Sequence, residues 1–477
     1  MNTPEIVIIG GGPTGLTAAL LLAKAGAAVL VLERDAGVAS TADPWGTWER
    51  PGVNQFRQLH IALPRWYRTM LAELPAVDAE LRALGGTEVN LLHRYPAGLT
   101  GGWQAGDEAY GTVTARRPML ESALARVAAA EPAIRLRRGA KVTGLATERA
   151  SDGGTRVVGV RIGNEVVPAR LVIDAAGTRT PIPGWLDAVG AGPSIQRSTS
   201  AVTYYTRHYR GPGGPPDATG AVLSHHESFS VLTVPSDGDT WALGLIVSST
   251  DRATRTLREP DVWEAAVRAA GVHPGWLAGS PLTDIQPLGG LQDVDRDYAP
   301  GGSSVVEGLV PLGDAWVTTS PFLGRGLSLG AMEAVALRDA YLASAAEGPR
   351  VQVGYARLLA DRVRPFVAAT VGFGRHRAAE LAAEATGVPY RTDDPAWAAS
   401  RALAAGVMHD PELLRAHVRI ASLLDTPTEV FADAALRARL GPYFAAPAYP
   451  ADRLGRPTFL AAIKGRQSTT TPEGVPA

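Results

Sequence analysis

The sequence has no cysteine among its 477 residues. A chain without cysteine can form no disulfide, no thiolate metal site and no cysteine nucleophile. It also lacks any run of about eighteen uncharged apolar residues, which argues against a transmembrane helix. The apolar stretch at residues 6–9 passes straight into glycines, unlike a signal peptide. We therefore expect a cytoplasmic protein without a membrane span.

An excess of charge of either sign is also missing. The chain has 46 Lys and Arg residues against 47 Asp and Glu residues, so it offers no basic field that would attract nucleic acid. Lysine is scarce, occurring only at positions 24, 141 and 464. No carboxylate–histidine cluster suggests a metal site. A hydrophobic content of 45% over 477 residues indicates a globular chain of two or three domains.

Glycine is abundant where the chain begins. An apolar run at residues 6–9 leads into Gly10, Gly12 and Gly15, with Pro13 and Thr14 between them, and an apolar helical pattern follows. In G-x-G-x-x-G the first glycine allows a tight turn, the second lets backbone approach a pyrophosphate, and the third permits close helix–strand packing. The helix start also favours an anion.

A second strand, residues 28–32, ends at Glu33, with Arg34 next. A carboxylate at this strand end can accept hydrogen bonds from an adenosine ribose, whereas it would repel a 2′-phosphate. Strand, glycine turn, helix and acid together predict dinucleotide binding. The alternative is a glycine turn that serves packing only.

A second glycine-rich stretch, "PLGDAWVTTSPFLGRGLSLGAMEA", lies at residues 311–334. A nicotinamide dinucleotide would be served by the first motif alone. FAD is longer and stays bound, so its ribityl chain and ring need a second contact point. The pair of motifs therefore favours FAD.

On these motifs the chain resembles the FAD-dependent monooxygenases of the para-hydroxybenzoate hydroxylase type, in the class A flavoprotein superfamily, and bacterial members of specialised metabolism in particular. The resemblance runs from about residue 4 to about residue 345. It implies that Asp314 binds the ribityl chain and that Arg117, in "RRPMLESAL", lies against the FAD phosphates or ribityl chain. It also implies that a helix start faces the flavin pyrimidine. The remaining residues that it implies in the second contact are Gly313, Pro321, Gly324, Gly326 and Leu327.

One motif departs from the family. Where members usually carry Asp-Gly, this chain has Ala176 before Gly177, with the acid displaced to Asp174. That pattern is more like flavin-dependent halogenases and two-component epoxidases, some of which receive reduced flavin from a partner. NAD(P)H is the expected electron donor, and the departure adds a route through a separate flavin reductase.

The sequence assigns no catalytic residue, but it offers candidates. The segment at residues 51–74 resembles a subset of the family in which polar residues, here including His60, lie near the flavin. A histidine between Leu59 and Ile61 is also typical of a protein core. In the strand-rich block after residue 198 the candidates are Tyr204, Arg207, His225 and His226. Strand alternation allows at most half of them to line a substrate pocket.

The expected fold is α/β: a Rossmann-like FAD-binding domain, an antiparallel sheet domain for the substrate, and a helical C-terminal region. The boundaries are 1–195 and 301–350 for the FAD domain, 196–300 for the sheet, and 351–477 for the helices. Helices are expected at 64–84, 118–130, 326–345 and 351–387, with Pro365 as a kink or break. Two more helices open with Asp-Pro at 394 and 410. Strands are expected at 134–138, 141–147, 156–162 and 170–174, and the tail from residue 465 is expected to be mobile.

The resemblance implies a reaction of reduced FAD with O2 to a C4a-hydroperoxide, which passes one oxygen atom to an aromatic or polyketide-like small molecule. Hydroxylation or epoxidation is expected, and Baeyer–Villiger insertion uses the same intermediate. Alternatives are a flavin-dependent reductase and a non-redox, FAD-bound cyclase. Halogenases of this type carry a lysine near the flavin and a Trp-x-Trp-x-Ile-Pro stretch, whereas this chain has no lysine between residues 25 and 140.

Overall fold

The computed structural model describes residues 5–37, 42–150, 153–216, 220–299, 306–347, 350–449 and 455–464. The tail predicted to be mobile lies outside the described residues. The chain divides into two compact units: residues 1–86, 112–198 and 292–371 form the first, and 87–111, 199–291 and 372–477 the second. The predicted boundaries, at 195, 300 and 350, stay predictions beside these divisions, which fall after residues 198, 291 and 371. Residues 87–111 and the C-terminal helices, however, join the predicted sheet in one unit.

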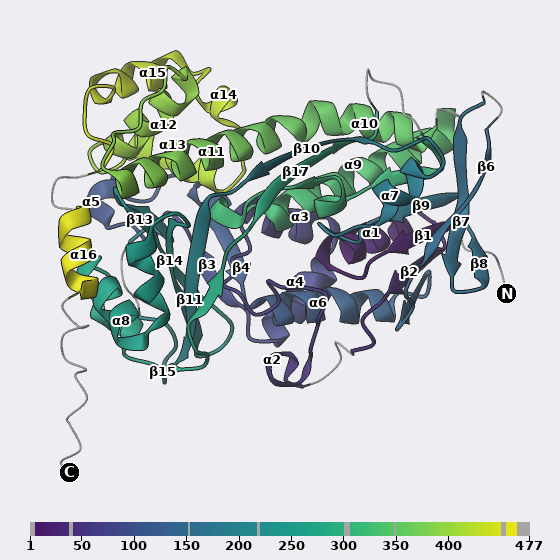
Figure 1. Cartoon of the computed structure of the whole chain (residues 1–477), viewed down its shortest axis with the longest axis horizontal. Helices are drawn as coiled ribbons and strands as arrows, with labels where there is room; N and C mark the ends of the chain where they lie inside the picture. The colour runs from purple at the N-terminus through teal and green to yellow at the C-terminus, as the bar shows by residue number, and fades with distance from the viewer. Residues whose placement is uncertain are drawn as a thin grey trace, which may run out of the picture. The chain divides into compact units, whose positions relative to one another are not determined.

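The first unit is built on a parallel sheet with strand order β19-β9-β1-β2-β5; Figure 1 labels its three central strands, β9, β1 and β2. Its strands are β1 (Ile6–Ile9), β2 (Val29–Glu33), β5 (Ile134–Arg138), β9 (Leu171–Asp174) and β19 (Leu309–Pro311). The register pairs Ile9 with Leu32 and with Asp174, and Asp174 with Pro311. The carboxyl ends of these strands therefore meet at one edge, where ligands of such sheets bind.

Residues of β1 alternate between two covering layers. Val7 and Ile9 belong to a core cluster with Val157, Val160 and other residues of a small sheet. The strand order of this sheet is β18 (Val306–Glu307), β7 (Thr155–Ile162) and β6 (Gly144–Arg149). The other face carries the helix α1 (Pro13–Lys24), which packs against α6 (Arg117–Ala130) and α9 (Gly326–Glu347). Both faces of β1 are buried, as its continuous apolar run predicts.

The remaining elements of the first unit complete these layers. Its further strands are β4 (Gly111–Thr114), β6 (Gly144–Arg149), β7 (Thr155–Ile162), β8 (Glu165–Pro168), β10 (Ser194–Thr199), β17 (Gln292–Asp297), β18 (Val306–Glu307) and β20 (Val317–Thr318). Its further helices are α2 (Pro44–Thr47), α3 (Pro64–Glu73), α4 (Pro75–Ala83), α7 (Ile182–Asp187), α10 (Val351–Arg362) and the start of α11 (Arg364–Thr386).

The second unit is an antiparallel sheet with helices. Its strands are β3 (Thr87–Asn90), β11 (Val202–Arg210), β12 (Leu223–His225), β13 (Phe229–Pro235), β14 (Thr240–Ser248), β15 (Ser280–Pro281) and β16 (Gln286–Leu288). Its helices are α5 (Ala97–Thr100), α8 (Pro260–Ala269), α12 (Pro395–Gly406), α13 (Pro411–Ala421), α14 (Pro427–Val430), α15 (Ala434–Leu440) and α16 (Arg456–Lys464).

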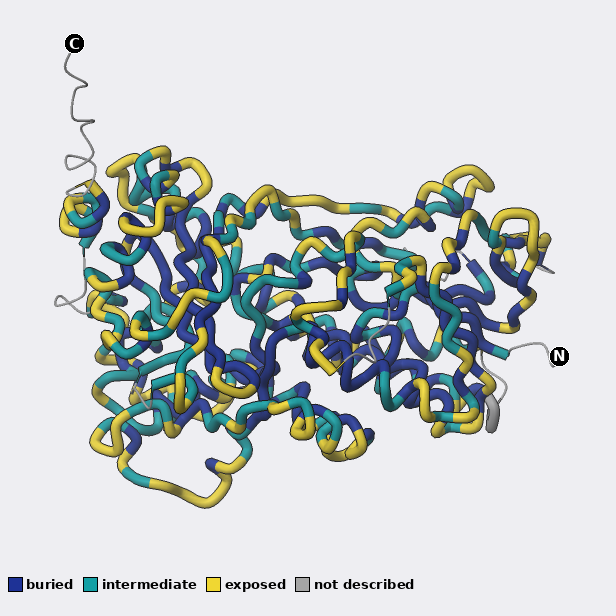
Figure 2. Tube along the Cα trace, turned by 90° about the horizontal axis from the view of Figure 1, so that it is seen from below, coloured by how far each residue is buried: buried dark blue, intermediate teal, exposed yellow. Residues whose placement is uncertain are grey.

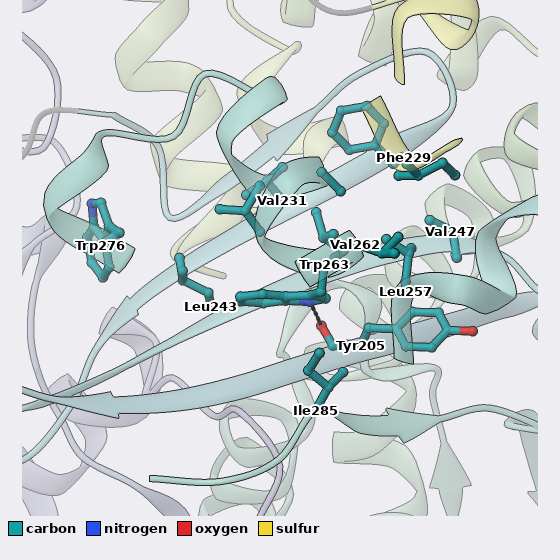
Figure 3. Close-up of a cluster of buried hydrophobic side chains, with 14 of the residues drawn as sticks. Tyr205, Phe229, Val231, Leu243, Val247, Leu257, Val262, Trp263, Trp276 and Ile285 are labelled. Carbon is teal, nitrogen blue, oxygen red and sulfur yellow. Dashed lines mark hydrogen bonds between the residues drawn. The ribbon is translucent and has the colours of Figure 1, made fainter. Parts of the chain in front are cut away.

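One face of this sheet packs on α8. Figure 3 shows Trp263 of α8 among Tyr205, Leu243 and Ile285, with the indole N–H donating to the Tyr205 carbonyl oxygen at 3.4 Å. Phe459 of α16 joins this cluster and stacks on Phe229 with ring centroids 4.3 Å apart. Figure 2 shows that buried residues lie in the interior of the fold and that many exposed residues lie in the loops.

Three expected elements have different limits. The helix expected at 64–84 is broken at Leu74, whose φ and ψ are −137° and 58°, because Pro75 disfavours helical geometry in the residue before it. The helix expected at 351–387 is two helices, α10 and α11, separated at Val363, which confirms the break predicted near Pro365. The strand expected from Lys141 begins at Gly144. The Asp-Pro helix starts are confirmed, since Asp394 and Asp410 accept hydrogen bonds from backbone N–H groups of α12 and α13.

Candidate functional site

The turn after β1 gives each glycine of the motif a different task. Gly10 has a φ of +109°, and a Cβ there would lie 2.3 Å from the Ala175 carbonyl oxygen. A Cβ on Gly15 would lie 2.2 Å from the Gly10 carbonyl oxygen. Nothing lies within 4 Å of a Cβ built on Gly12, which is the N-cap of α1. The second glycine therefore opens on the space that a pyrophosphate would need.

Thr14 joins the two glycine-rich segments of the chain. A Cβ on Gly330 of α9 would lie 2.3 Å from Thr14 Oγ1, and one on Gly313 would lie 3.2 Å from the same side chain. Only glycine at position 330 permits this approach of α1 and α9. The stretch at 311–334 thus lies directly against the turn at 10–15, which a single ligand shared by both requires.

Glu333 of α9 holds the start of the second segment. The Gly313 backbone N–H donates to Glu333 Oε2 at 2.5 Å, and Gly313 itself has a φ of +63°. Burial, and then the neighbouring charge of Asp314, raise the pKa of Glu333 to about 8. The carboxyl group is therefore largely protonated at neutral pH, although it keeps the lone pair that the Gly313 N–H needs.

The predicted flavin contacts of the second segment surround the beginning of α9. Pro321 opens a 3-10 helix at Pro321–Leu323, and Gly324 follows with a φ of +65°. Gly326 begins α9, and nothing lies within 4 Å of a Cβ built on it, while Leu327 is half-buried in the first turn. The first N–H groups of a helix here could face a ligand that carries negative charge.

Glu33 is the last residue of β2, and its carboxylate accepts hydrogen bonds from two backbone N–H groups. Oε2 accepts the Gly11 N–H at 2.8 Å, and Oε1 accepts the Asp35 N–H at 2.9 Å. A carboxylate has about four lone-pair positions, so one on Oε1 stays open for a ribose hydroxyl. Arg34 is half exposed and lies against the backbone of Gly52.

Arg117 begins α6 and is held on two sides. Its Nε donates to Glu121 Oε1 at 2.6 Å, and its Nη1 lies 3.1 Å from His60 Nε2. His60 Nδ1 lies 3.0 Å from the Gln58 carbonyl oxygen, which can only accept, so Nδ1 carries the proton and Nε2 accepts from Arg117. Burial, and then the charge of Arg117, lower the pKa of His60 to about 4. His60 is thus a neutral hydrogen-bond acceptor.

Asp314 is bound to the turn that follows β9. Thr178 Oγ1 donates to Asp314 Oδ2 at 3.1 Å. Arg296 donates to the Asp314 carbonyl oxygen at 2.9 Å and to the Thr178 carbonyl oxygen at 2.7 Å. Burial raises the pKa of Asp314, against the hydrogen bond from Thr178 and the charges of Arg117 and Arg296.

The displaced acid of the departing motif has a structural task. Asp174 is fully buried and accepts the Thr180 hydroxyl at 2.6 Å and the Ala176 N–H at 3.1 Å. Burial raises the pKa of Asp174 to about 6, against these two hydrogen bonds. Ala176 itself is exposed. The acid therefore stabilises the turn and does not substitute for a carboxylate at position 176.

The candidates of the second unit separate onto two faces of its sheet. Tyr204 and His225 lie on the face opposite α8, which we call the inner face. Arg207 lies on the α8 face, where its Nη1 donates to Glu264 at 3.4 Å, and His226 stacks on Phe229 of the core cluster. Alternation therefore places two of the four candidates on each face, and which of them line a substrate pocket stays a prediction.

Several residues of the site carry no motif of their own. They are Arg50, Glu121, Arg296 and Glu333. One signal could have found Glu121, because an acid four residues after an arginine on a helix forms an ion pair with it. The others meet the site only through tertiary contacts.

These residues fit FAD. Gly12 leaves room at a helix start, Glu33 keeps an open lone-pair position, and Arg117 has three of its five N–H groups without a hydrogen bond among the described contacts. An acid, a cation and a glycine-lined helix start are the groups that a ribose, a diphosphate and a ring edge require.

Comparisons with known proteins agree with this reading. Residues 3–50 match the model of the FAD binding domain family. PqsL, a probable FAD-dependent monooxygenase from Pseudomonas aeruginosa, is 18% identical, with a TM-score of 0.61 over 80% of this chain and 97% of its own. OxyS, an anhydrotetracycline hydroxylase from Streptomyces rimosus, is 20% identical, with a TM-score of 0.54 over 89% and 77%. CmlS, a flavin-dependent halogenase, is 19% identical, with a TM-score of 0.58 over 89% and 78%.

No curated protein sequence matches the chain. At these identities the solved structures report the fold, and the sequence match reports the FAD-binding segment. None of the helices in the described ranges combines the length and the apolar composition of a membrane span. The FAD-binding match at the N-terminus and the shared fold confirm the predicted resemblance: residues 3–50 match an FAD-binding family, and the chain has the fold of solved FAD-dependent monooxygenases and of a flavin-dependent halogenase.

Proposed function

We propose that the chain is a monooxygenase that inserts one oxygen atom from O2 into an aromatic or polyketide-like small molecule, by hydroxylation or epoxidation. The observation that carries this proposal is the contact of the two glycine-rich segments at Thr14 within this fold. When bound, FAD supplies the activation of O2 and the oxygen transfer. The protein supplies binding, orientation and exclusion of water.

Different residues of the first unit would bind different parts of FAD. The α1 start at Gly12 would receive the diphosphate, and Glu33 the ribose diol. The free N–H groups of Arg117 would reach a phosphate or the ribityl chain, and Asp314 would accept from ribityl hydroxyls. The α9 start at Gly326 would favour negative charge on the ring.

The inner face of the second unit is our proposed substrate surface. Its central positions are Tyr204 and Thr206 on β11, Gly244 and Ile246 on β14, and Leu232 on β13, all paired in one register. The described strand positions on this face include no carboxylate. A mainly apolar surface with hydroxyl groups suits an aromatic substrate and keeps water out of an oxygen transfer.

Electrons would come from NAD(P)H, either directly or through a separate flavin reductase. Position 176 favours the second route, since Ala176 stands where family members usually carry an acid and buried Asp174 cannot take its place. Rapid mixing of the holoenzyme with NADH, with NADPH and with a reductase that supplies reduced flavin distinguishes the routes. We further propose that the protein acts in the cytoplasm, where NAD(P)H is available.

The proposal is tested on the purified protein by its colour, its consumption of O2 and the mass of its product. The protein should be yellow, and with a reductant it should consume O2 and give a product 16 mass units heavier than the substrate, as one added oxygen atom requires. Aromatic compounds and polyketides form the substrate panel. A colourless protein that FAD cannot reconstitute would overturn the proposal.

The mass of the product separates the other functions. A gain of two hydrogens indicates a reductase, and a halogen in the product indicates halogenation, which the fold shared with CmlS makes a relevant control. Conversion that persists without O2 and without reductant indicates a cyclase. The absence of lysine between residues 25 and 140 argues against the halogenase.

A further inference from the structure

Ion pairs and hydrogen bonds connect Glu33 with Arg117, two residues of the proposed FAD site. Arg50 Nη2 donates to Glu33 Oε2 at 2.5 Å, and Arg50 Nη1 pairs with Glu121 Oε2. Glu121 Oε1 accepts from Arg117 Nε at 2.6 Å, and Arg117 Nη1 reaches His60 at 3.1 Å. We call these five residues, Glu33, Arg50, Glu121, Arg117 and His60, the relay.

Three members of the relay are buried, and two of them, Arg50 and Glu121, keep their charges near neutral pH. The side chains of Arg50, Glu33 and Glu121 are 4%, 4% and 0% exposed. Burial alone would raise the pKa of Glu121, but the charges of Arg50 and Arg117 and their hydrogen bonds lower it below its ordinary value. Burial alone would lower the pKa of Arg50, yet Glu121, Glu33 and Asp35 raise it. Neither group changes its charge near neutral pH.

Arg50 and Glu121, the inner members of the relay, contact Glu33 and Arg117 and have almost no exposed side-chain surface. Glu121 has no exposed side-chain surface, and both of its oxygens are occupied by arginines. Arg50 donates from Nη1 to Glu121 and from Nη2 to Glu33. Its Nε donates to Asp35 at 3.3 Å. Their contribution to ligand binding must therefore act through Glu33 and Arg117.

We propose that Arg50 and Glu121 are positioning residues that hold the adenosine-binding carboxylate Glu33 and the phosphate-binding guanidinium Arg117 in one rigid arrangement before FAD arrives. His60 completes the arrangement by accepting one Arg117 N–H, which leaves three for the ligand. A preorganised site loses less freedom on binding, so affinity depends on residues that do not touch the ligand. The inference rests on FAD binding and is independent of oxygen transfer.

Charge-preserving variants test the proposal on the apoprotein. Arg50→Lys keeps the cation but loses the fork that bridges two carboxylates. Glu121→Asp keeps the anion but shortens the side chain, so it cannot reach both arginines. Titration calorimetry with ADP, which carries only the adenosine and the diphosphate, and flavin fluorescence with FAD report affinity. Both variants should bind ADP and FAD at least about fivefold more weakly.

A surface ion pair provides the matched control. Glu165 and Arg137 form a two-bond pair in the same unit, with side chains 50% and 36% exposed. Glu165→Gln should leave both affinities unchanged. Folded Arg50→Lys and Glu121→Asp proteins that bind ADP and FAD like the unaltered chain would overturn the proposal, even if their melting temperatures fall.

A third variant changes an uncharged side chain outside the buried ion pairs, so it tests the relay even if the first two variants fail to fold. His60→Leu deletes the acceptor for Arg117 and should weaken FAD binding, whereas His60→Gln, which retains an acceptor, should restore it. Equal FAD affinity in His60→Leu and the unaltered chain would contradict the relay. The measurements need neither substrate nor O2, so their failure is distinct from a failure of the proposed reaction.

Discussion

Single side chains set the pH response of the first unit, and Glu333 offers the clearest case. Its folded-state pKa of about 8 lies above the ordinary value of 4.5. A raised carboxyl pKa means that its stabilising contribution is complete below about pH 4.5 and is lost as the pH rises through 8. Glu333→Gln keeps an acceptor for the Gly313 N–H without titrating.

We expect Glu333→Gln to gain stability relative to the unaltered chain as the pH rises from 5 to 8, by up to about 1.4 kcal/mol per pH unit. Urea unfolding of both proteins at several pH values measures the difference. Glu165→Gln should show a constant difference over this range, because the hydrogen bond and charge of Arg137 lower the pKa of Glu165. A pH-independent effect of Glu333→Gln would contradict the assignment.

Two neighbouring tyrosines test the proposed substrate face. Tyr204 lies on the inner face, whereas Tyr205 is part of the cluster under α8. For a substrate found by the oxygenation assay, Tyr204→Phe should raise the KM about two- to tenfold, as the loss of one hydrogen bond predicts. Tyr205→Phe should leave the KM unchanged. Equal effects of the two changes would argue against the inner face.

At the residue scale, the sequence could propose the glycines, Glu33 and Arg117, because local patterns identify them. It offered His60 as a site candidate, with a core histidine as the favoured alternative. The structure places a partly buried His60 beside Arg117, where burial and that positive charge lower its pKa to about 4, and its role in the site stays a prediction. Arg50 could not be found, since its partners are 17 and 71 residues away in the chain.

Helix packing decides whether the two glycine-rich segments can share a ligand. Gly330→Ala would place a Cβ 2.3 Å from Thr14 Oγ1, so α1 and α9 would have to move apart. Overpacking of this kind costs about 1–3 kcal/mol, although alanine is the better helix former. We expect lower thermal stability and weaker FAD binding, measured by melting with and without FAD.

Gly354→Ala is the matched control for that experiment. A Cβ there would lie 3.6 Å from the Ala340 Cβ, an ordinary contact, so the change should be neutral or stabilising. Adding Thr14→Ala to Gly330→Ala should recover part of the loss. Unaltered FAD affinity in Gly330→Ala would mean that the α1–α9 contact does not set the site.

The C-terminal helix α16 is the second element with a measurable role. Phe459 is fully buried and stacks on Phe229. Phe459→Ala should destabilise the second unit by about 3–5 kcal/mol. Phe444→Ala, at a residue that is 56% exposed, should change stability by less than about 0.5 kcal/mol. Chemical denaturation followed by tryptophan fluorescence measures both, and similar losses would contradict the packing.

Elements could be predicted where local signals are strong. Asp-Pro pairs placed the starts of α12 and α13, and alternation placed β11, β13 and β14. The break between α3 and α4 was missed because an amphipathic pattern runs across Pro75, and the restriction that proline imposes on Leu74 outweighs that pattern.

The fold brings together the two glycine-rich segments, which lie about 300 residues apart in the sequence. Amide hydrogen exchange can show whether both segments are protected by one bound ligand. FAD should slow amide exchange in residues 10–16 and 313–330 together, since both would contact one ligand. Residues 394–421, in the second unit, serve as an internal reference that should not change. Protection of only one of the two segments would contradict a shared cofactor.

The sequence alone determined which chemistry the chain could carry. Its glycine spacing, the acid after β2 and the second glycine-rich stretch indicate FAD, because these requirements are local and leave a pattern. Only the tertiary structure decided which side chains support that chemistry. The relay, the Thr14 contact and the separation of Tyr204 from Arg207 depend on register and on distant contacts. Such contacts form only when strands and helices from remote parts of the chain pack together.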